Sequence, residues 1–312
     1  MPIRIDKDLP AFKKLTGENV FVIPEDLAVK QDIRPLKVAI LNLMPTTVDT
    51  EIQILRLLGN TPLQVDICLL NMGSHESHNA PPGHLERFYI NSKDAFDEYF
   101  DGMIITGAPV ETLSFEDVDY WQELTRLFDY SAKKVFSTMH ICWGAQAALY
   151  HRYGIKKIAL SNKLFGVFAH NVNERLSPLF RGFDDIFLSP QSRHTESDRN
   201  SIASNKKLKI QSCTPCGSPF IVTARNGREI YITGHLEYDA LTLDGEYKRD
   251  KEKGLPINIP TNYYLNDDPK NKPFVRWRAH AHLFFSNWIN YVYQQTPFDI
   301  SHLSLNNSNK HE

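Results

Sequence analysis

A single stretch of the chain, Lys134-Val-Phe-Ser-Thr-Met-His-Ile-Cys-Trp-Gly-Ala-Gln146, decides the fold because a strand and a helix meet within it. Residues 134–139 have the apolar pattern of a buried β-strand, and a helix is predicted over residues 142–150 directly after it. The junction falls at Cys142. In a parallel α/β sheet, such a junction lies at the carboxyl edge, where ligands bind.

Strand and helix alternate in the same way on both sides of this stretch. Thr46 and Gly59 are typical boundaries for a helix that carries Ile52, Leu55 and Leu58 on one face. Further helices are predicted over residues 115–130 and about 278–293, and strands over residues 37–43, 64–70, 102–106, 155–160, 185–188, 208–212, 220–224 and 229–233. This alternation predicts an α/β fold with a doubly wound, mostly parallel sheet of the flavodoxin-like kind.

Length and composition are those of an ordinary globular protein. The 312 residues fit one α/β domain over residues 36–300, with an irregular segment over residues 1–35 that wraps the body and a polar tail over residues 301–312. A formal net charge of −2 argues against a strongly basic nucleic-acid-binding protein. Four cysteines are too few for a disulfide scaffold, and no run approaches the roughly 18 apolar residues of a membrane span, so we expect a cytoplasmic protein.

Cys142 has the local sequence of a nucleophile. A sharp strand-to-helix turn presents the side chain to the cleft, as in the nucleophile elbow of hydrolases, and Gly144 allows the backbone to turn tightly beside it. The backbone N–H of Trp143, at the start of the helix, would then point at a developing oxyanion. The alternative is an inert buried cysteine, which is common, and the elbow by itself leaves the two about equally favoured.

A base for this thiol is offered by Tyr231-Ile-Thr-Gly-His-Leu-Glu-Tyr238, which follows another predicted strand. His235 and Glu237 are two residues apart, so in an extended chain they share a face, and the carboxylate can orient the imidazole. His-x-Glu alone is a weak motif, but with Cys142 at an elbow it predicts a Cys–His–Glu triad. The rival interpretation, a metal-binding pair, lacks an obvious third ligand, and we expect no metal.

These motifs resemble those of class I glutamine amidotransferases, whose elbow reads Gly-x-Cys-x-Gly-x-Gln and whose second motif is usually His-Pro-Glu. Gly144 and Gln146 match, whereas His140 and Leu236 depart from that pattern. A more specific resemblance is to the homoserine O-acyltransferases, which resemble the amidotransferases in fold. It covers roughly residues 1–300 and rests on the blocks Met1–Pro10, Ile40–Pro45, Leu57–Leu63, Phe100–Pro109, His140–Gln146 and Arg276–Arg278.

The resemblance implies an enzyme that transfers an acyl group from coenzyme A to the hydroxyl of L-homoserine in methionine biosynthesis. It implies no bound cofactor, an acyl-CoA co-substrate, a ping-pong reaction through a thioester on Cys142, and a homodimer. The oxyanion would rest on the backbone N–H groups of Trp143 and of Gly107 and Ala108. No coenzyme A motif is visible in the sequence, so that expectation comes from the resemblance alone.

The resemblance also assigns substrate contacts. It implies that Arg249 binds the carboxylate of homoserine, that Glu246 is a candidate for its ammonium group, and that Lys163 and Ser192 contact substrate. Glu246 and Arg249 share a helical face at spacing i, i+3, and without the resemblance a surface ion pair is the simpler interpretation. Gln191 departs from the family, which usually has His there.

Glu111 bears on the choice of acyl donor. In the family a Gly at this position leaves room for a succinyl carboxylate, whereas Glu fills the space. Two carboxylates about 4 Å apart repel by roughly 4 kcal/mol at an effective dielectric constant of about 20, so we expect acetyl-CoA. The alternative for Glu111 is a water-facing residue in the first turn of a helix near residues 112–116. Alternatives for the protein are a succinyltransferase, a glutaminase-like cysteine hydrolase and a non-catalytic binding or redox-sensing protein.

Two other groups of residues are given no functional role. Cys213-Thr-Pro-Cys216 is a lone Cys-x-x-Cys, and a zinc site usually needs a second such pair. His75, His78 and His84 lie in or next to a Gly/Pro/Asn-rich stretch over residues 71–83, for which we expect a mobile loop.

Overall fold

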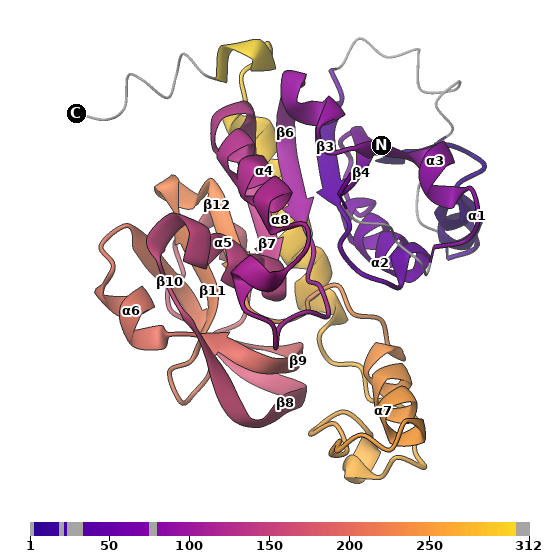
Figure 1. Ribbon diagram of the computed structural model, residues 1–312, viewed down its shortest axis with the longest axis vertical. Helices are drawn as coiled ribbons and strands as arrows, with labels where there is room; N and C mark the ends of the chain where they lie inside the picture. The colour runs from indigo at the N-terminus through magenta and orange to yellow at the C-terminus, as the bar shows by residue number, and fades with distance from the viewer. Residues whose placement is uncertain (1–2, 19–21, 24–33, 75–79, 304–312) are drawn as a thin grey trace.

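The computed structural model describes residues 3–18, 22–23, 34–74 and 80–303. Residues 304–312 of the predicted polar tail lie outside the described residues, and so do His75 and His78. The described strands join in one 12-stranded sheet that carries helices on both faces (Figure 1). The strands are β1 (Ile3–Arg4), β2 (Val22–Ile23), β3 (Leu36–Leu41), β4 (Val65–Asn71), β5 (Tyr89–Asn91), β6 (Phe100–Ile105), β7 (Val135–Ile141), β8 (Lys157–Val172), β9 (Ile186–Ser197), β10 (Leu208–Cys213), β11 (Pro219–Ala224) and β12 (Glu229–Ile232). The helices are α1 (Pro10–Gly17), α2 (Thr47–Leu58), α3 (His84–Phe88), α4 (Trp121–Lys134), α5 (Trp143–Tyr153), α6 (Arg199–Ser204), α7 (Thr242–Glu252) and α8 (Arg278–Gln295).

The sheet has a parallel half and an antiparallel half. Its order is β2-β1-β4-β3-β6-β7-β12-β11-β10-β8-β9, with β5 paired to β4. All pairs from β2 to β12 are parallel, and all pairs from β12 to β9 are antiparallel. β12 therefore joins the two halves. Because it runs parallel to β7, the residues that follow these two strands leave the sheet at the same edge.

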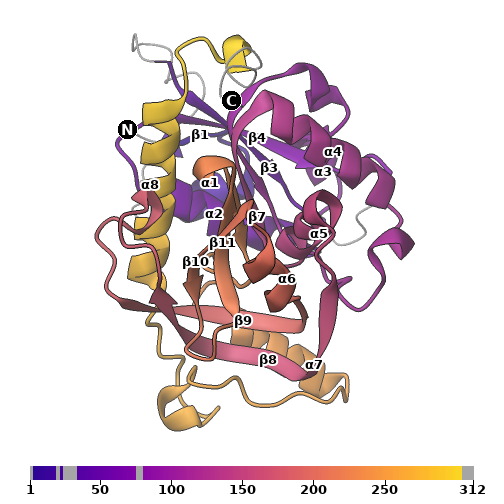
Figure 2. The ribbon, with the colours of Figure 1, turned by 90° about the vertical axis from the view of Figure 1, so that its left-hand side faces the viewer.

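The two faces of the sheet are packed by alternate residues of each strand, as the period of two requires. In β3, Val38 and Ile40 pack in the cluster that contains α2 and α8, whereas Ala39 and Leu41 pack in the cluster that contains α4 and α5. Figure 2 shows α8 on the side of the sheet opposite α5. The continuous apolar run predicted for a doubly covered strand is thus confirmed.

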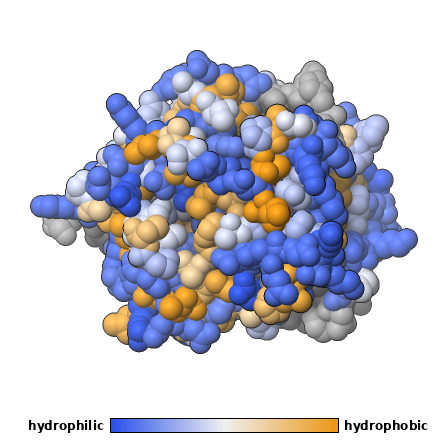
Figure 3. Space-filling view, turned by 90° about the horizontal axis from the view of Figure 1, so that it is seen from below, coloured by the Kyte–Doolittle hydropathy of each residue, from blue (hydrophilic) through white to orange (hydrophobic). Residues whose placement is uncertain are grey.

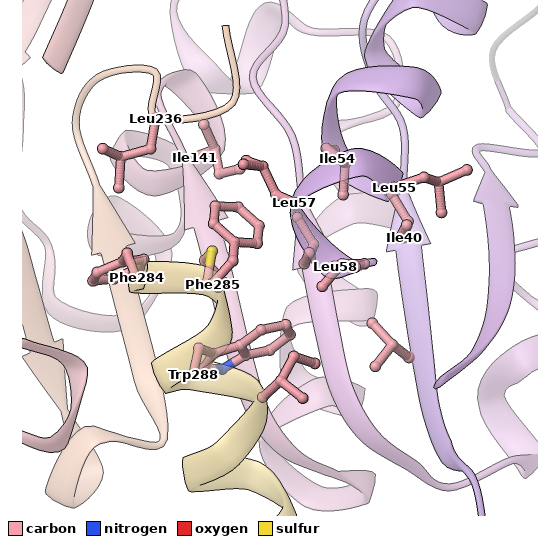
Figure 4. Close-up of a cluster of buried hydrophobic side chains, with 14 of the residues drawn as sticks. Ile40, Ile54, Leu55, Leu57, Leu58, Ile141, Leu236, Phe284, Phe285 and Trp288 are labelled. Atoms are coloured by element: carbon pink, nitrogen blue, oxygen red, sulfur yellow. The ribbon is translucent and has the colours of Figure 1, made fainter. Parts of the chain in front are cut away.

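Helix α8 closes one face of the parallel half. Phe284, Phe285 and Trp288 pack among side chains of α2 and of the central strands (Figure 4). The approach is close, because a Cβ on Gly102 would lie 2.9 Å from the Trp288 ring. The indole Nε1 of Trp288 donates to the Ser137 hydroxyl on β7 at 2.9 Å, so the helix is also held by a buried hydrogen bond.

The antiparallel half ends in a hairpin of β8 and β9, and both strands are longer than predicted. Strands were expected only over residues 155–160 and 185–188, but β8 runs to Val172 and β9 from Ile186 to Ser197. Their polar residues stay extended because they pair with each other from Lys157↔Ser197 to Asn171↔Ile186. Figure 3 shows the face on the side of this hairpin and α7, where hydrophobic residues gather near the middle among hydrophilic ones.

Two further expectations are corrected. The helix predicted over residues 115–130 runs from Trp121 to Lys134 and is preceded by a 3₁₀ turn at Phe115–Asp117, which repeats every three residues and so mimics the helical spacing. The N-terminal segment contains α1 and two short strands that extend the sheet, rather than irregular structure alone. The division at residues 35 and 300 stays a prediction. Among the residues that the structure describes, no helix combines the length and apolar character of a membrane span.

Candidate active site

Cys142 lies in a strained turn between β7 and α5. Its φ of 49° falls in the left-handed region that non-glycine residues rarely adopt, as in a nucleophile elbow. Two glycines make the turn possible: a Cβ on Gly107 would lie 3.2 Å from the Cβ of Cys142, and a Cβ on Gly144 would lie 2.6 Å from the Thr106 carbonyl oxygen. The predicted elbow is therefore present, and its side chain lines a pocket.

His235 and Glu237 follow β12 at the same edge of the sheet. Since Ile141 of β7 pairs with Ile232 of β12 in parallel register, the segments that follow these two strands leave the sheet side by side. The Nδ1 atom of His235 and Oε1 of Glu237 are 2.6 Å apart, and both side chains are buried. The structure thus brings the three residues of the predicted triad together.

The charge of His235 is set by its two neighbours. Burial by itself lowers the pKa of the imidazole, but Cys142 and Glu237 outweigh it and raise the pKa well above its usual value. Because Nδ1 faces Glu237, Nε2 is the nitrogen that is left to exchange a proton with the sulfur. A protonated imidazole between a sulfur and a carboxylate is the arrangement of an activated thiol.

Leu236 explains why both members of His-x-Glu face the pocket. Its side chain is 1% exposed and packs in the cluster that contains Ile141 and α8 (Figure 4). The chain turns at residues 236–237, and with Leu236 buried in that cluster the side chains of His235 and Glu237 both line the pocket. The departure from His-Pro-Glu therefore leaves the geometry of the motif intact.

The predicted oxyanion groups lie beside Cys142. The N–H of Trp143 is the first of α5, a position that has no intrahelical acceptor. The indole of Trp143 is fully buried against Phe115 and Tyr120, so this residue can offer only its backbone to the pocket. Gly107 and Ala108 line the same pocket after the end of β6, and a Cβ on Gly107 would lie 3.2 Å from the Cβ of Cys142 and 3.7 Å from the backbone nitrogen of Trp143.

Glu111 reaches the pocket from the loop after β6. Its carboxylate accepts a hydrogen bond from the His194 backbone N–H at 2.9 Å, and the Thr195 hydroxyl lies 3.5 Å from the same oxygen. Glu111 lies before the 3₁₀ turn at Phe115–Asp117, so it is not in the first turn of a helix. The interpretation of Glu111 as a water-facing helix start is therefore wrong.

Five polar residues form a cluster, which we call the charged cluster, on the wall of the pocket contributed by the hairpin and α7. They are Lys163 on β8, Ser192 on β9, and Glu246, Arg249 and Asp250 on α7. The Ser192 hydroxyl donates to Glu246 at 2.5 Å, and the Lys163 ammonium is 3.3 Å from the same carboxylate oxygen. Asp250 links the two cations, at 2.7 Å from Nε of Arg249 and 3.6 Å from Nζ of Lys163.

Except for Trp143, the candidate functional residues line one pocket of about 680 Å³. The triad, Gly107, Ala108, Glu111 and the charged cluster share its lining with Met44, Thr46, Asp49, Gln53, His194, Tyr238 and Leu255, among others. A pocket of this size accommodates a small metabolite together with part of a larger donor. Within the described residues, no group of His, Cys, Asp and Glu side chains is arranged to hold a metal ion.

Some residues stand elsewhere than expected. Gln191 does not line the pocket but packs behind it, where its amide would be 2.8 Å from a Cβ on Gly234. His84 is buried in α3 with its Nε2 2.7 Å from Glu51, so it is not part of a mobile loop. Asp250 and Tyr238 were missed because an acid next to Arg249 and an aromatic next to Glu237 look like ordinary surface and core residues in sequence.

The comparisons with known proteins bear on this site. Residues 2–298 match the family described as "HTS: Homoserine O-succinyltransferase". The chain belongs to this family. The resemblance drawn from its motifs is confirmed. Similar proteins named homoserine O-acetyltransferase include that of Acetivibrio thermocellus, 54% identical over 304 residues with 97% of this chain and 100% of that protein covered, and that of Clostridium novyi, 56% identical over 300 residues with 96% and 99% covered.

Solved structures support the fold of this family member. A glutamine amidotransferase from Thermotoga maritima matches with a TM-score of 0.56 at 12% identity, covering 83% of this chain and 99% of that one. The glutaminase domain of Trypanosoma brucei CTPS with bound acivicin matches with a TM-score of 0.51 at 10% identity, covering 83% and 94%. At these identities the likeness shows the fold alone. It confirms the predicted amidotransferase-like α/β fold.

Proposed function

We propose that this protein is a homoserine O-acetyltransferase, which moves an acetyl group from acetyl-CoA to the hydroxyl of L-homoserine in methionine biosynthesis. Relatives at 54–56% identity over almost the whole chain carry that name. The observation that carries the proposal is the triad of Cys142, His235 and Glu237 in one pocket with Glu111 and the charged cluster. A cytoplasmic location and a homodimer stay predictions.

The first half of the proposed reaction acylates the enzyme. His235 takes the proton of Cys142, and the sulfur attacks the carbonyl carbon of acetyl-CoA. The oxyanion of the tetrahedral intermediate is stabilised by backbone N–H groups of Trp143 and of Gly107 and Ala108. The C–S bond to coenzyme A breaks, the leaving thiolate takes the proton back from His235, and a thioester on Cys142 remains.

The second half transfers the acetyl group to the acceptor. His235 takes the proton of the homoserine hydroxyl, whose oxygen attacks the thioester, and the C–S bond to Cys142 breaks as the ester forms. Glu237 keeps the imidazole oriented and stabilises its protonated form in both halves. The two substrates therefore react in turn, which gives ping-pong kinetics.

The acceptor is a zwitterion, and the charged cluster offers both signs of charge. Nε of Arg249 donates a hydrogen bond to Asp250. The two terminal nitrogens of the guanidinium are then available to bind the carboxylate of homoserine. Lys163 stands beside it between Asp250 and Glu246. We assign the carboxylate of homoserine to Arg249 and Lys163, and its ammonium group to Glu246 with the help of Ser192.

The donor preference follows from Glu111. Its carboxylate is fixed by the His194 N–H and lines the same pocket as Cys142. An acetyl group brings no charge to this place, whereas the distal carboxylate of a succinyl group would meet Glu111 at close range. Even about a third of the roughly 4 kcal/mol repulsion between two such charges gives tenfold discrimination.

Mass spectrometry after mixing the protein with each acyl-CoA tests the proposal. We expect an acetyl adduct on the peptide that contains Cys142, its loss on addition of L-homoserine, and little succinyl adduct. Cys142→Ser should abolish the adduct and acetyl transfer to homoserine, whereas Cys216→Ser, which changes an exposed cysteine outside the pocket, should retain both. Near-normal transfer by Cys142→Ser would rule out the covalent route. Glutamine hydrolysis without any acyl adduct would favour a glutaminase-like hydrolase instead.

A further inference from the structure

Tyr238 lies between two parts of the pocket that the proposed reaction uses at different steps. Its ring stacks on the imidazole of His235, with centroids 4.0 Å apart and planes 18° from parallel. Its phenol lines the same pocket as Glu246 of the charged cluster and feels the negative charge of that carboxylate. One side chain therefore stacks on the proposed general base and lies in the same pocket as the residue assigned to the acceptor's ammonium group.

The backbone of Tyr238 is anchored from behind. Its carbonyl oxygen accepts a hydrogen bond from the Trp277 indole at 2.8 Å, and Trp277 is fully buried. Tyr238 itself is 8% exposed and packs in a cluster with Leu243 and Tyr247 of α7. Because these contacts fix the position of the Tyr238 ring, the ring can in turn restrict the orientation of the His235 imidazole stacked on it.

The hydroxyl of Tyr238 stays protonated throughout the physiological range. Burial is the main cause, and the negative charges of Glu246 and Glu237 add to it, so the pKa of the phenol is well above its usual value. The hydroxyl is thus a permanent donor. The Glu246 carboxylate is held by hydrogen bonds from Ser192 and Lys163, and the Tyr238 phenol shares its pocket as a further potential donor.

We propose that Tyr238 is a positioning residue with two separable tasks: its ring keeps the His235 imidazole in line with Cys142, and its hydroxyl keeps Glu246 in place for the acceptor. The second task rests on the proposed function, since it takes L-homoserine as the acceptor. The first concerns only the thiol and the imidazole, and is independent of what the thiol attacks.

Two substitutions separate the tasks. Tyr238→Phe keeps the ring and removes the hydroxyl, whereas Tyr238→Leu removes the ring as well. The first measurement is the rate at which iodoacetamide alkylates Cys142, followed on its own peptide by mass spectrometry. The second is the Kd of L-homoserine, measured by calorimetry on the full-length protein, together with kcat and KM for acetyl transfer.

For Tyr238→Phe we expect an alkylation rate within about twofold of the wild type, and a Kd and KM for L-homoserine that rise about tenfold because a hydrogen bond to a charged group is lost. For Tyr238→Leu we expect alkylation of Cys142 to slow about tenfold or more as well. Should Tyr238→Leu not fold, Tyr238→Met, whose longer and more flexible side chain adapts better to the space left by the ring, takes its place.

Tyr264→Phe is the matched control. Its hydroxyl donates to a carboxylate, that of Asp244, at 2.6 Å in the same cluster but outside the pocket lining, so this variant should change neither measurement. The inference is overturned if Tyr238→Phe leaves the Kd unchanged, if it slows alkylation as much as Tyr238→Leu does, or if alkylation stays at the wild-type rate in Tyr238→Leu.

Failure of the proposed function gives a different pattern. A wild-type protein that binds L-homoserine but forms no acetyl adduct contradicts the proposed donor chemistry and leaves Tyr238's tasks standing. A wild-type protein that does not bind L-homoserine overturns the second task together with the proposed acceptor, and the alkylation rates still decide the first.

Discussion

At the scale of single residues, the pair of His235 and Glu237 offers the sharpest test. Glu237→Gln keeps the shape of the side chain but removes the charge that raises the imidazole pKa. We expect the pKa of His235 to fall, and kcat/KM for acetyl transfer to fall about ten- to a hundredfold, since a charged hydrogen bond contributes about 1.5–3 kcal/mol. The measurements are a histidine NMR titration, with His235 assigned from the His235→Gln spectrum, and steady-state kinetics. An unshifted titration would contradict the role of Glu237.

Glu111 is the second residue whose charge is decisive. Glu111→Gly removes both charge and volume, so we expect the ratio of kcat/KM for succinyl-CoA over acetyl-CoA to rise at least about tenfold. Glu111→Gln keeps the volume and removes only the charge, and should give a smaller rise. Competition between the two donors, read out as the masses of the adducts on Cys142, measures both ratios. An unchanged preference in Glu111→Gly would refute the electrostatic explanation.

At the scale of elements, α5 must lie directly on the end of β6. A Cβ added at Gly144 would lie 2.6 Å from the Thr106 carbonyl oxygen and 3.1 Å from that of Ile105, and neither backbone atom can move aside easily. Gly144→Ala should therefore cost about 1–3 kcal/mol of stability and displace the amide groups next to Cys142. Chemical denaturation and the adduct yield on Cys142 measure the two effects. Gly17→Ala, where a Cβ meets nothing within 4 Å, should be nearly neutral in both.

Elements also show what sequence patterns can and cannot predict. The predicted bounds of β3, β7 and α8 agree with the structure to within two residues at each end, because these buried elements are rich in apolar residues. The strands of the β8–β9 hairpin were predicted too short, because much of their sequence is polar and lacks the alternation of apolar and polar residues that marks a strand. Their backbones pair with each other, and some of their polar side chains line the pocket. Lys163 and Ser192 lie on that hairpin, so no local pattern places them in the site, and only the family resemblance pointed to them.

The meeting of Cys142 and His235 at one edge of the sheet could be predicted because it needs only topology. Two strand ends at the carboxyl edge of one parallel sheet are expected to meet, and Cys142 and His235 follow such ends. The stacking of Tyr238 and the bridge made by Asp250 depend on side-chain packing between distant segments. That packing is not encoded in residue spacing, which explains why neither residue was expected.

At the scale of the whole molecule, a buried carboxylate network ties β12 to α5 at the other end of β12 from the pocket. Glu229 is 3.2 Å from Arg152 and 3.1 Å from Arg225, and it accepts the Tyr231 hydroxyl at 2.6 Å. Burial alone would raise the pKa of Glu229, but Arg152, Tyr231 and Arg225 lower it below 4.5. A lowered pKa in the folded state means that the carboxylate stabilises the fold above the unfolded pKa.

Stability should therefore depend on Glu229 in a pH-dependent way. We expect Glu229→Gln to lose about 3 kcal/mol of unfolding free energy at pH 7, because Arg152, whose side chain is only 12% exposed, loses its carboxylate partner. The difference from the wild type should shrink below about pH 4, as the carboxylate is protonated when the pH falls through its lowered pKa. Urea unfolding across this range measures it. Glu252→Gln, at an exposed position, should show no difference, and a loss at Glu229 that is independent of pH would contradict the linkage.

The place of α8 has a consequence for synthesis on the ribosome. Phe284, Phe285 and Trp288 cover strands β3, β6 and β7, which leave the ribosome more than a hundred residues earlier. His235 likewise joins Cys142 only after the β8–β9 hairpin has been made. Contacts so distant in sequence close slowly, and until they do the apolar face of the parallel half stays uncovered. A nascent chain that stops before residue 278 should therefore aggregate or recruit chaperones. In the proposed mechanism Cys142 also stays without its base until the chain reaches residue 235, so we expect its reactivity to arise late, when the fold is almost finished.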